Sequence, residues 1–290
     1  MDTQAVRVED LRKTYGDRAV VDGVSFDIAR GETLALLGPN GAGKSTTVEI
    51  LEGFRRRTGG RVEVLGADPE TAGLEHRARL GIVPQSTGRT GPLTVRELLR
   101  QFAGLSPRPR DVDELIADVG LAGQARTRVS KLSGGQRRRV DVALGIVGRP
   151  EVLFLDEPTT GFDPHARRGF WGLIRCLQAD GTTILLTTHD LDEAAQLADR
   201  VAVLVAGRLR AIGPVAALGG EDARLPIVRW TEAGRPREER TARPFALAEA
   251  IAGRLGAPAD DIEIVRPRLE DVYLGLVREQ EHGVLDGGVR

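Results

Sequence analysis

The stretch that decides the fold is residues 38–46, which read Gly38-Pro39-Asn40-Gly41-Ala42-Gly43-Lys44-Ser45-Thr46. This stretch matches the phosphate-binding pattern GxxxxGK[ST], and it lies between an apolar run and a helix-like run. Glycines let backbone N–H groups close around phosphate oxygens, and the N-terminus of the following helix adds its dipole. In such a loop Lys44 places a positive charge on the β- and γ-phosphates, and Ser45 offers a hydroxyl to Mg²⁺.

The alternative is a glycine-rich turn that binds nothing. Only three of the 41 basic residues are lysines, which favours a specific role for Lys44. The pattern therefore predicts a nucleotide site, but it does not by itself distinguish a transporter from a kinase.

Composition limits the class of protein. The 290 residues include 41 basic and 42 acidic ones, so a net charge of −1 offers no overall field for nucleic acid or an anionic membrane. The longest uncharged run, residues 33–43, is far shorter than the roughly twenty residues of a membrane helix. Cys176 is the only cysteine, and residues 1–4 lack the start of a signal segment. We therefore expect a soluble intracellular protein with no internal disulfide.

Two polar or aromatic residues stand out near the predicted strands. Apolar alternation predicts strands within residues 5–30 and 62–64, and an apolar run predicts another at 80–84. Tyr15 is either a strand-end aromatic or a platform that stacks on adenine. Gln85 is either an ordinary loop residue or a side chain at the carboxyl end of a strand, where open α/β sheets bind ligands.

A run of helices is predicted from about residue 88 to 150. Thr94 and Glu97 have the spacing of a capping box, as do Ser133 and Gln136. The second box encloses two glycines, which are poor helix formers but expose backbone N–H groups to an anion. Its alternative is a strong helix N-cap with a flexible entry. The three arginines that follow, residues 137–139, predict a solvated helix face.

Two later strands end in residues suited to catalysis. Residues 152–157 are apolar up to Asp156 and Glu157, which predicts a central strand with two carboxylates at its tip. These carboxylates either cap neighbouring amides or hold Mg²⁺ and draw a proton from water. His189 ends a second buried strand, where it is either structural or a donor to a γ-phosphate. Residues from about 218 onward predict short strands and two helices, with no recognisable chemistry.

Together these motifs resemble the ATP-binding-cassette (ABC) ATPase family over about residues 4–217. The landmarks occur in the family's order: residues 38–45 resemble the Walker A loop, Gln85 the Q-loop, residues 132–136 the signature segment, residues 152–157 Walker B with its catalytic glutamate, Asp163 the D-loop aspartate and His189 the switch histidine. Phe162 stands where the family usually has leucine, and both are apolar. Residues 268–274 resemble the terminal motif of daunorubicin-resistance and multidrug exporters.

The resemblance implies a P-loop NTPase (RecA-like) α/β fold with a mixed sheet. The expected parts are a nucleotide-binding domain at 4–217 with its helical subdomain at 88–150, a small α+β appendage at 218–280 and a disordered tail at 281–290. The implied catalytic residues are Glu157, His189 and Lys44. The residues implied to bind ATP are Tyr15, Gly38, Asn40, Gly41, Gly43, Lys44, Ser45, Thr46, Gln85, Ser133, Gly135, Gln136 and Asp163. Those implied to hold Mg²⁺ are Ser45, Gln85 and Asp156.

The resemblance also implies a function and partners. We expect an ATP-hydrolysing motor that drives export of a drug, antibiotic or lipid-like substrate through a separate membrane permease. Two copies would dimerise head to tail around ATP at the cytoplasmic face of the membrane, without nucleic acid. The alternatives are a soluble ABC ATPase acting on ribosomes or DNA, and an ATP-gated regulator. The single cassette, and the spacing of about ninety residues between the phosphate loop and the signature segment, count against the first alternative.

Overall fold

The computed structural model describes residues 3–85, 91–232, 234–256 and 262–276 of the chain. Its contacts divide the chain into two compact units, Met1–Ile212 and Gly213–Arg290, which we describe separately as the first and second unit. The expected tail at 281–290 and the first residues of the expected helical subdomain, 88–90, lie outside the described residues. The domain bounds predicted from the sequence stay a prediction.

The first unit is built on a six-stranded sheet in the order β5-β6-β7-β3-β8-β9. Its strands are β3 (Thr33–Leu37), β5 (Leu80–Val83), β6 (Val152–Asp156), β7 (Thr183–Thr188), β8 (Arg200–Val205) and β9 (Arg208–Pro214). The first five of these are joined by parallel pairings. Every residue of β3 and β7 is buried, as apolar runs without alternation predict for central strands covered on both faces.

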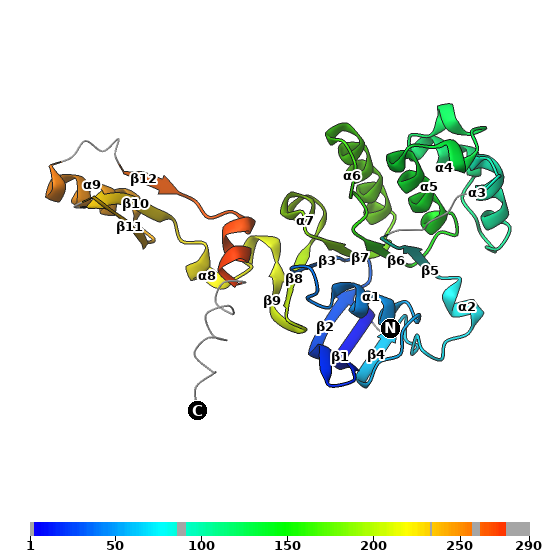
Figure 1. Cartoon of the computed structure of the whole chain (residues 1–290), viewed down its shortest axis with the longest axis horizontal. Helices are drawn as coiled ribbons and strands as arrows, with labels where there is room; N and C mark the ends of the chain where they lie inside the picture. The colour runs from blue at the N-terminus through cyan, green and yellow to red at the C-terminus, as the bar shows by residue number, and fades with distance from the viewer. Residues whose placement is uncertain (1–2, 86–90, 233, 257–261, 277–290) are drawn as a thin grey trace. The chain divides into compact units, whose positions relative to one another are not determined.

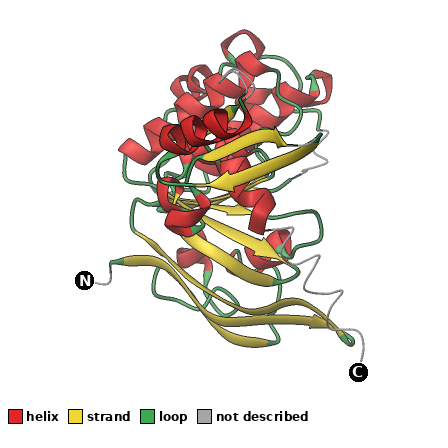
Figure 2. Ribbon diagram, turned by 90° about the vertical axis from the view of Figure 1, so that its left-hand side faces the viewer, coloured by secondary structure: helices red, strands yellow, loops and turns green. Residues whose placement is uncertain are grey.

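An antiparallel sheet in the order β2-β1-β4 covers one side of the six-stranded sheet (Figures 1 and 2). It consists of β1 (Gln4–Tyr15), β2 (Arg18–Ala29) and β4 (Gly59–Val64). Helix α1 (Lys44–Leu51) contributes Val48 and Ile50 to a core shared with Leu34 and Phe154 of the large sheet. The core thus fastens α1, and the loop before it, to both sheets.

Helices cover the other side of the six-stranded sheet (Figures 1 and 2). On this side lie α3 (Val95–Ala103), α4 (Val112–Asp118), α5 (Gly134–Ile146), α6 (Pro164–Ala179) and α7 (Leu191–Leu197), with short 3-10 turns at Ala122–Gln124 and Val129–Lys131. Helix α2 (Leu74–Arg77) lies beside β4 instead, with the Nε2 of His76 2.7 Å from the carbonyl oxygen of Val64. The two predicted capping boxes are confirmed, because each N-cap hydroxyl accepts from its N3 amide and each N3 side chain accepts from the N-cap amide. Cys176 is exposed on α6.

The second unit holds a three-stranded antiparallel sheet in the order β11-β10-β12. Its elements are a 3-10 turn (Val215–Ala217), α8 (Gly220–Ala223), β10 (Ile227–Glu232), β11 (Arg235–Arg240), α9 (Pro244–Leu255), β12 (Glu263–Val265) and a helix at 269–276. The sequence predicted β10, β12 and two helices. It did not predict β11, because this strand is polar throughout and exposed at every residue. The mixed α/β class expected from the sequence is confirmed.

Candidate functional site

The loop at 38–45 joins β3 to α1 and is packed tightly against the rest of the first unit. Gly43 has a left-handed φ of 101°, and a Cβ placed on it would lie 2.6 Å from the carbonyl oxygen of Val20. A Cβ on Gly38 would lie 2.2 Å from the carbonyl oxygen of Leu204. At position 43 only glycine tolerates both the left-handed φ and the close approach of the Val20 carbonyl oxygen. Packing within the chain therefore requires glycine at Gly38 and Gly43, whereas a Cβ on Gly41 would meet no atom within 4 Å.

Lys44 is enclosed by this loop. Its side chain is only 6% exposed, and its Nζ donates to the carbonyl oxygens of Gly38 at 2.7 Å and Pro39 at 3.2 Å. Burial lowers the pKa of Lys44, and the carboxylates of Glu157 and Asp156 act against this shift. The ammonium group is thus held by the loop in the cleft that Glu157 also lines, where it can meet a polyphosphate.

The order of the parallel strands explains why distant residues meet. Because β5, β6, β7 and β3 are neighbours, the segments that follow them emerge at one edge of the sheet. Asp156 ends β6, and its Oδ1 accepts a hydrogen bond from the hydroxyl of Thr187 on β7. The backbone amide of Glu157 donates to the carbonyl of Thr187 at 3.0 Å. The two strands therefore hold both carboxylates beside the phosphate loop.

Glu157 is the centre of a polar cluster. Its Oε2 accepts from the Nε2 of Gln85 at 3.0 Å and from the hydroxyl of Thr160 at 3.4 Å. Its Oε1 lies 3.4 Å from the Nδ1 of His189. The side chain of Glu157 is 12% exposed, whereas that of His189 is 63% exposed. The structure thus brings together three of the predicted site residues, which lie far apart in the sequence.

A cleft of about 470 Å³ opens beside this cluster. It is lined by Tyr15, Arg18, Val20, Asn40, Gly41, Gly43, Lys44, Ser45, Thr46, Gln85 and Glu157. Nine of these residues were candidates from the sequence, whereas Arg18 and Val20 were not. Both belong to the start of β2, which reaches the cleft through packing between the two sheets, and no local pattern signals this position.

Tyr15 stands at the rim of the cleft and is 44% exposed. The Nζ of Lys13 lies 4.8 Å from the ring centroid, and the Cζ of Arg55 lies 5.6 Å from it. Arg55 also donates to the Tyr15 hydroxyl. These contacts hold an accessible aromatic ring at the cleft, which is the geometry that stacking on a base requires.

The donor set at the cleft fits Mg²⁺. Mg²⁺ binds through one or two carboxylates and hydroxyls together with waters and substrate phosphates. The lining of the cleft supplies the exposed hydroxyl of Ser45 and the amide oxygen of Gln85. Asp156 is not part of that lining, but at the end of β6 it directly precedes Glu157, which is, and it supplies a carboxylate. Among the described residues no group of three or more His, Cys, Asp or Glu side chains could form an all-protein metal cage. One carboxylate, one hydroxyl and one amide oxygen leave coordination positions for waters and substrate phosphates, which Mg²⁺ usually binds.

The signature segment does not line the cleft. Ser133 is the N-cap of α5 and is exposed, and a Cβ on Gly134 or Gly135 would meet no atom within 4 Å. Ser133, Gly135 and Gln136 are absent from the lining of the cleft, as is Asp163. Asp163 caps α6 by accepting from the amide of Ala166 at 2.8 Å, and backbone hydrogen bonds lower its pKa. These four candidates are not brought to the cleft by their own chain.

One expectation at α5 is wrong. The predicted solvated face at 137–139 includes Arg138, which is only 7% exposed and donates to three backbone carbonyls. Gly145 lies two turns later on the same face, and a Cβ there would stand 2.6 Å from a methyl group of Val83. The spacing of Arg138, Val142 and Gly145 at i, i+4 and i+7 was the signal that could have identified this buried face.

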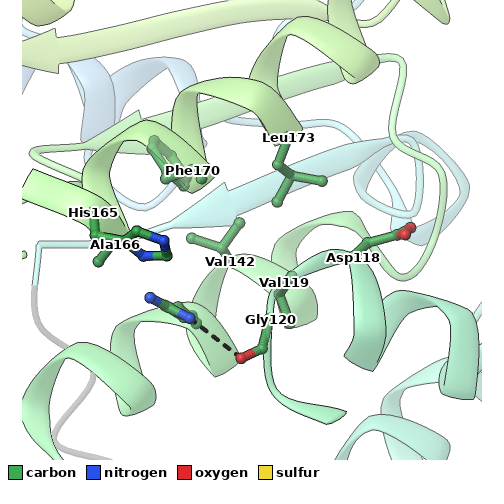
Figure 3. Close-up of a pocket in the computed structure, with 10 residues that line it drawn as sticks. Asp118, Val119, Gly120, Val142, His165, Ala166, Phe170 and Leu173 are labelled. Atoms are coloured by element: carbon green, nitrogen blue, oxygen red, sulfur yellow. Dashed lines mark hydrogen bonds between the residues drawn. The ribbon is translucent and has the colours of Figure 1, made fainter.

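A second cavity of about 160 Å³ lies between α4, α5 and α6 (Figure 3). Phe170 and Leu173 face Val142 across it. Arg139, which also lines the cavity, donates to the carbonyl of Gly120 at 3.2 Å. None of the site residues predicted from the sequence lines it. It is therefore separate from the cleft at the phosphate loop.

A family profile and individual relatives both relate this chain to ABC transporter proteins. The family profile described as "ABC transporter" matches residues 21–160. The chain is 38% identical to "Daunorubicin resistance ATP-binding protein DrrA3" of Streptomyces coeruleorubidus, with 94% of this chain and 95% of that protein covered. It is 40% identical to "Nod factor export ATP-binding protein I" of Rhizobium johnstonii, with 96% of each chain covered.

A solved structure described as an ATP-binding subunit of an ABC transporter has the same fold, with a TM-score of 0.71 at 24% identity. The match covers 94% of this chain and 99% of that one. Within the part of the chain that the structure describes, no helix has the length and apolar character needed to cross a bilayer.

Proposed function

This chain belongs to the ATP-binding subunits of ABC transporters, an ATP-hydrolysing family, and from that premise we propose that it drives export through a separate membrane permease. The names of two relatives support export, since one refers to daunorubicin resistance and the other to Nod factor export. These cargoes differ, so the proposed cargo is a class: a drug, an antibiotic or a lipid-like molecule. The site of action is then the cytoplasmic face of the membrane.

The observation that carries the proposed mechanism is the cluster around Glu157. The Gln85 amide and the His189 imidazole hold this carboxylate at the cleft that also exposes the phosphate loop. Glu157 takes a proton from the attacking water, which makes that water a better nucleophile toward the γ-phosphate. His189 donates a hydrogen bond to the γ-phosphate, and Lys44 binds the β- and γ-phosphates.

The remaining contacts orient the nucleotide. Tyr15 stacks on the adenine, and the backbone amides of the loop that contains Asn40, Gly41 and Thr46 cradle the phosphates. Asp156, Ser45 and Gln85 would hold Mg²⁺, which neutralises charge on the phosphates when it is bound.

The signature segment completes the site of a second copy in this proposal. Ser133, Gly135 and Gln136 are held at the start of α5, away from the cleft, and the two glycines face open space. Backbone N–H groups at a helix start attract an anion. Two copies arranged head to tail would place this anion site on the partner's γ-phosphate, with Asp163 at the same interface. The permease then docks near Gln85 and the helices after it.

Replacing Glu157 by Gln tests the mechanism. The variant Glu157→Gln should retain ATP and accumulate as a dimer, while turnover falls by roughly 10²–10⁴ through loss of the general base. Turnover is measured as phosphate release, and association as the ATP-dependent change in mass by light scattering. Wild-type turnover in this variant would remove Glu157 from its role. Recovery of the chain with ribosomes instead of membranes would contradict the transporter assignment.

A further inference from the structure

Arg138 is a buried cation that the proposed mechanism does not use. It lies in the second turn of α5, two residues after the signature segment, with 7% of its side chain exposed. Burial lowers the pKa of its guanidinium, whereas the carboxylates of Asp141, Asp156, Glu193 and Glu157 act against this shift. A charge placed inside a protein is retained only where groups of opposite sign and hydrogen bonds compensate it. The surroundings of Arg138 provide both.

The guanidinium donates to three main-chain carbonyls from two strand ends. Nε donates to Pro158 at 3.0 Å, Nη2 donates to Asp156 at 2.6 Å, and Nη1 donates to Pro84. A planar fork of donors is the only common side-chain group that can serve three acceptors at fixed angles. Arg138 therefore joins the end of β5 to the end of β6.

These carbonyls belong to the residues that flank the reacting side chains. Pro84 directly precedes Gln85, while Asp156 and Pro158 stand on either side of Glu157. Glu157 itself has a left-handed φ of 45°, a conformation that side chains other than glycine and asparagine rarely adopt. Such backbone persists only where the surrounding structure constrains it. Hydrogen bonds to the residues before and after Glu157 supply this constraint.

The same conclusion follows from the contact between Gln85 and Glu157. The Nε2 of Gln85 lies 3.0 Å from the Oε2 of Glu157, although the two residues are on separate loops that follow the neighbouring strands β5 and β6. Arg138 binds the backbone of both loops and so determines the separation at which the two side chains face each other. A displacement of about 1 Å at a reacting group can cost about 10²-fold in rate.

We propose that Arg138 is a positioning residue, which holds Glu157 and Gln85 in register for proton abstraction by binding the carbonyls of Pro84, Asp156 and Pro158. The inference rests on the proposed function of Glu157. Arg138 itself does not touch the nucleotide cleft, whose lining lacks it. Its loss should therefore slow the chemical step and leave the binding of ATP nearly unchanged.

The experiment compares Arg138→Met, which removes all three donors, with Arg138→Lys, which keeps the charge but cannot reach three carbonyls. Phosphate release by the full chain should give a kcat lowered about 10- to 100-fold in Arg138→Met, with the KM for ATP changed less than about threefold. Arg138→Lys should lie between this variant and the wild type. Arg57→Met is the matched control, because Arg57 is also largely buried and ion-paired, with Asp68, but lies outside the cleft.

A double-mutant cycle with Glu157→Gln separates positioning from a merely structural role. If Arg138 acts through Glu157, Arg138→Met should lower the residual turnover of Glu157→Gln by less than about threefold. An equal loss in both backgrounds, or a wild-type kcat in Arg138→Lys, would overturn the inference. If Arg138→Met does not fold, the cycle is run with Arg138→Lys. Wild-type turnover in Glu157→Gln alone would instead contradict the proposed function.

Discussion

The two glycine-rich segments of the first unit differ in what surrounds them. Gly38 and Gly43 of the phosphate loop lie so close to Leu204 and Val20 that a Cβ would clash with main-chain oxygens. Gly134 and Gly135 of the signature segment would meet nothing within 4 Å. The first pair is therefore required by the fold of this chain. The second pair has no such requirement, which is expected where space is kept for a group from outside the chain.

The largest effect is expected for Gly43→Ala. Its Cβ would lie 2.6 Å from the Val20 carbonyl on a backbone with a φ of 101°, so the loop must move. ATP affinity should fall by more than about 10³-fold, and the free energy of unfolding should fall by about 2–4 kcal/mol. Binding of a fluorescent ATP analogue and denaturant unfolding measure these two quantities.

Gly66→Ala is the control for Gly43→Ala. Gly66 has a φ of 78° but open space around its Cβ position, so only backbone strain of about 1 kcal/mol is expected. Equal effects of the two substitutions would show that close packing does not explain the glycine at 43.

The second-largest effect is expected for the stability of variants at Glu52, which lies at the C-terminal end of α1. Desolvation, with smaller contributions from Asp156 and Glu49, raises the pKa of Glu52 from 4.5 to about 8. Between these two values the folded chain keeps a proton that the unfolded chain has lost, so stability falls as pH rises, by at most about 1.4 kcal/mol per pH unit. Glu52→Gln removes this dependence. Its gain in unfolding free energy over the wild type should therefore be about 3 kcal/mol larger at pH 8 than at pH 5, without Mg²⁺.

The exposed Glu75 provides the matched control, and Glu75→Gln should show no such difference between pH 5 and pH 8. A gain for Glu52→Gln that does not change with pH would show that Glu52 is ionised in the folded chain.

Gly135→Ala should lower activity without lowering the stability of the fold. Ala favours a helix over Gly by up to about 1 kcal/mol, so the variant should be as stable as the wild type or more stable. The added methyl group occupies the space that we assign to the partner's phosphate, so ATP-dependent dimerisation and turnover should fall by about 30-fold, about 2 kcal/mol. Sedimentation with ATP and thermal unfolding give the two readouts.

Gly172→Ala, an exposed helical glycine in α6 with equally open surroundings, should gain stability without losing turnover. Full activity in Gly135→Ala would contradict this assignment, because the open space at Gly135 would then not be needed for the partner's phosphate.

The smallest effect is expected for Tyr15→Ala. Loss of a stacking ring should weaken ATP binding by about tenfold while unfolding changes little, because the ring is 44% exposed. Tyr15→Phe keeps the ring and should bind ATP as the wild type does. Isothermal titration of both variants distinguishes stacking from the contact between the Tyr15 hydroxyl and Arg55, since only the latter is lost in Tyr15→Phe.

The features that the sequence could predict are those set by local patterns. The phosphate loop, the capping boxes at Thr94 and Ser133 and the buried strand β6 each follow from adjacent residues, and the structure contains all of them. Strand order then places Gln85, Glu157 and His189 together, although no local pattern gives the distances between them.

The features that the sequence did not predict depend on packing between distant segments. Arg138 lies among arginines that read as a solvated face, and only its contact with strand ends far away in the sequence makes it buried. Arg18 reaches the cleft because one sheet packs on another. Strand β11 forms by pairing with β10, although its residues show no apolar alternation.

Cys176 has a practical consequence for measuring the motion of this protein. It is the chain's only cysteine, and it is exposed on α6, the helix that Asp163 caps. A thiol-reactive spin label would therefore attach at one position per molecule without any substitution of the native sequence. In an assembly of two molecules the pair of labels would yield a single distance, and its change on adding nucleotide would follow closure and opening directly.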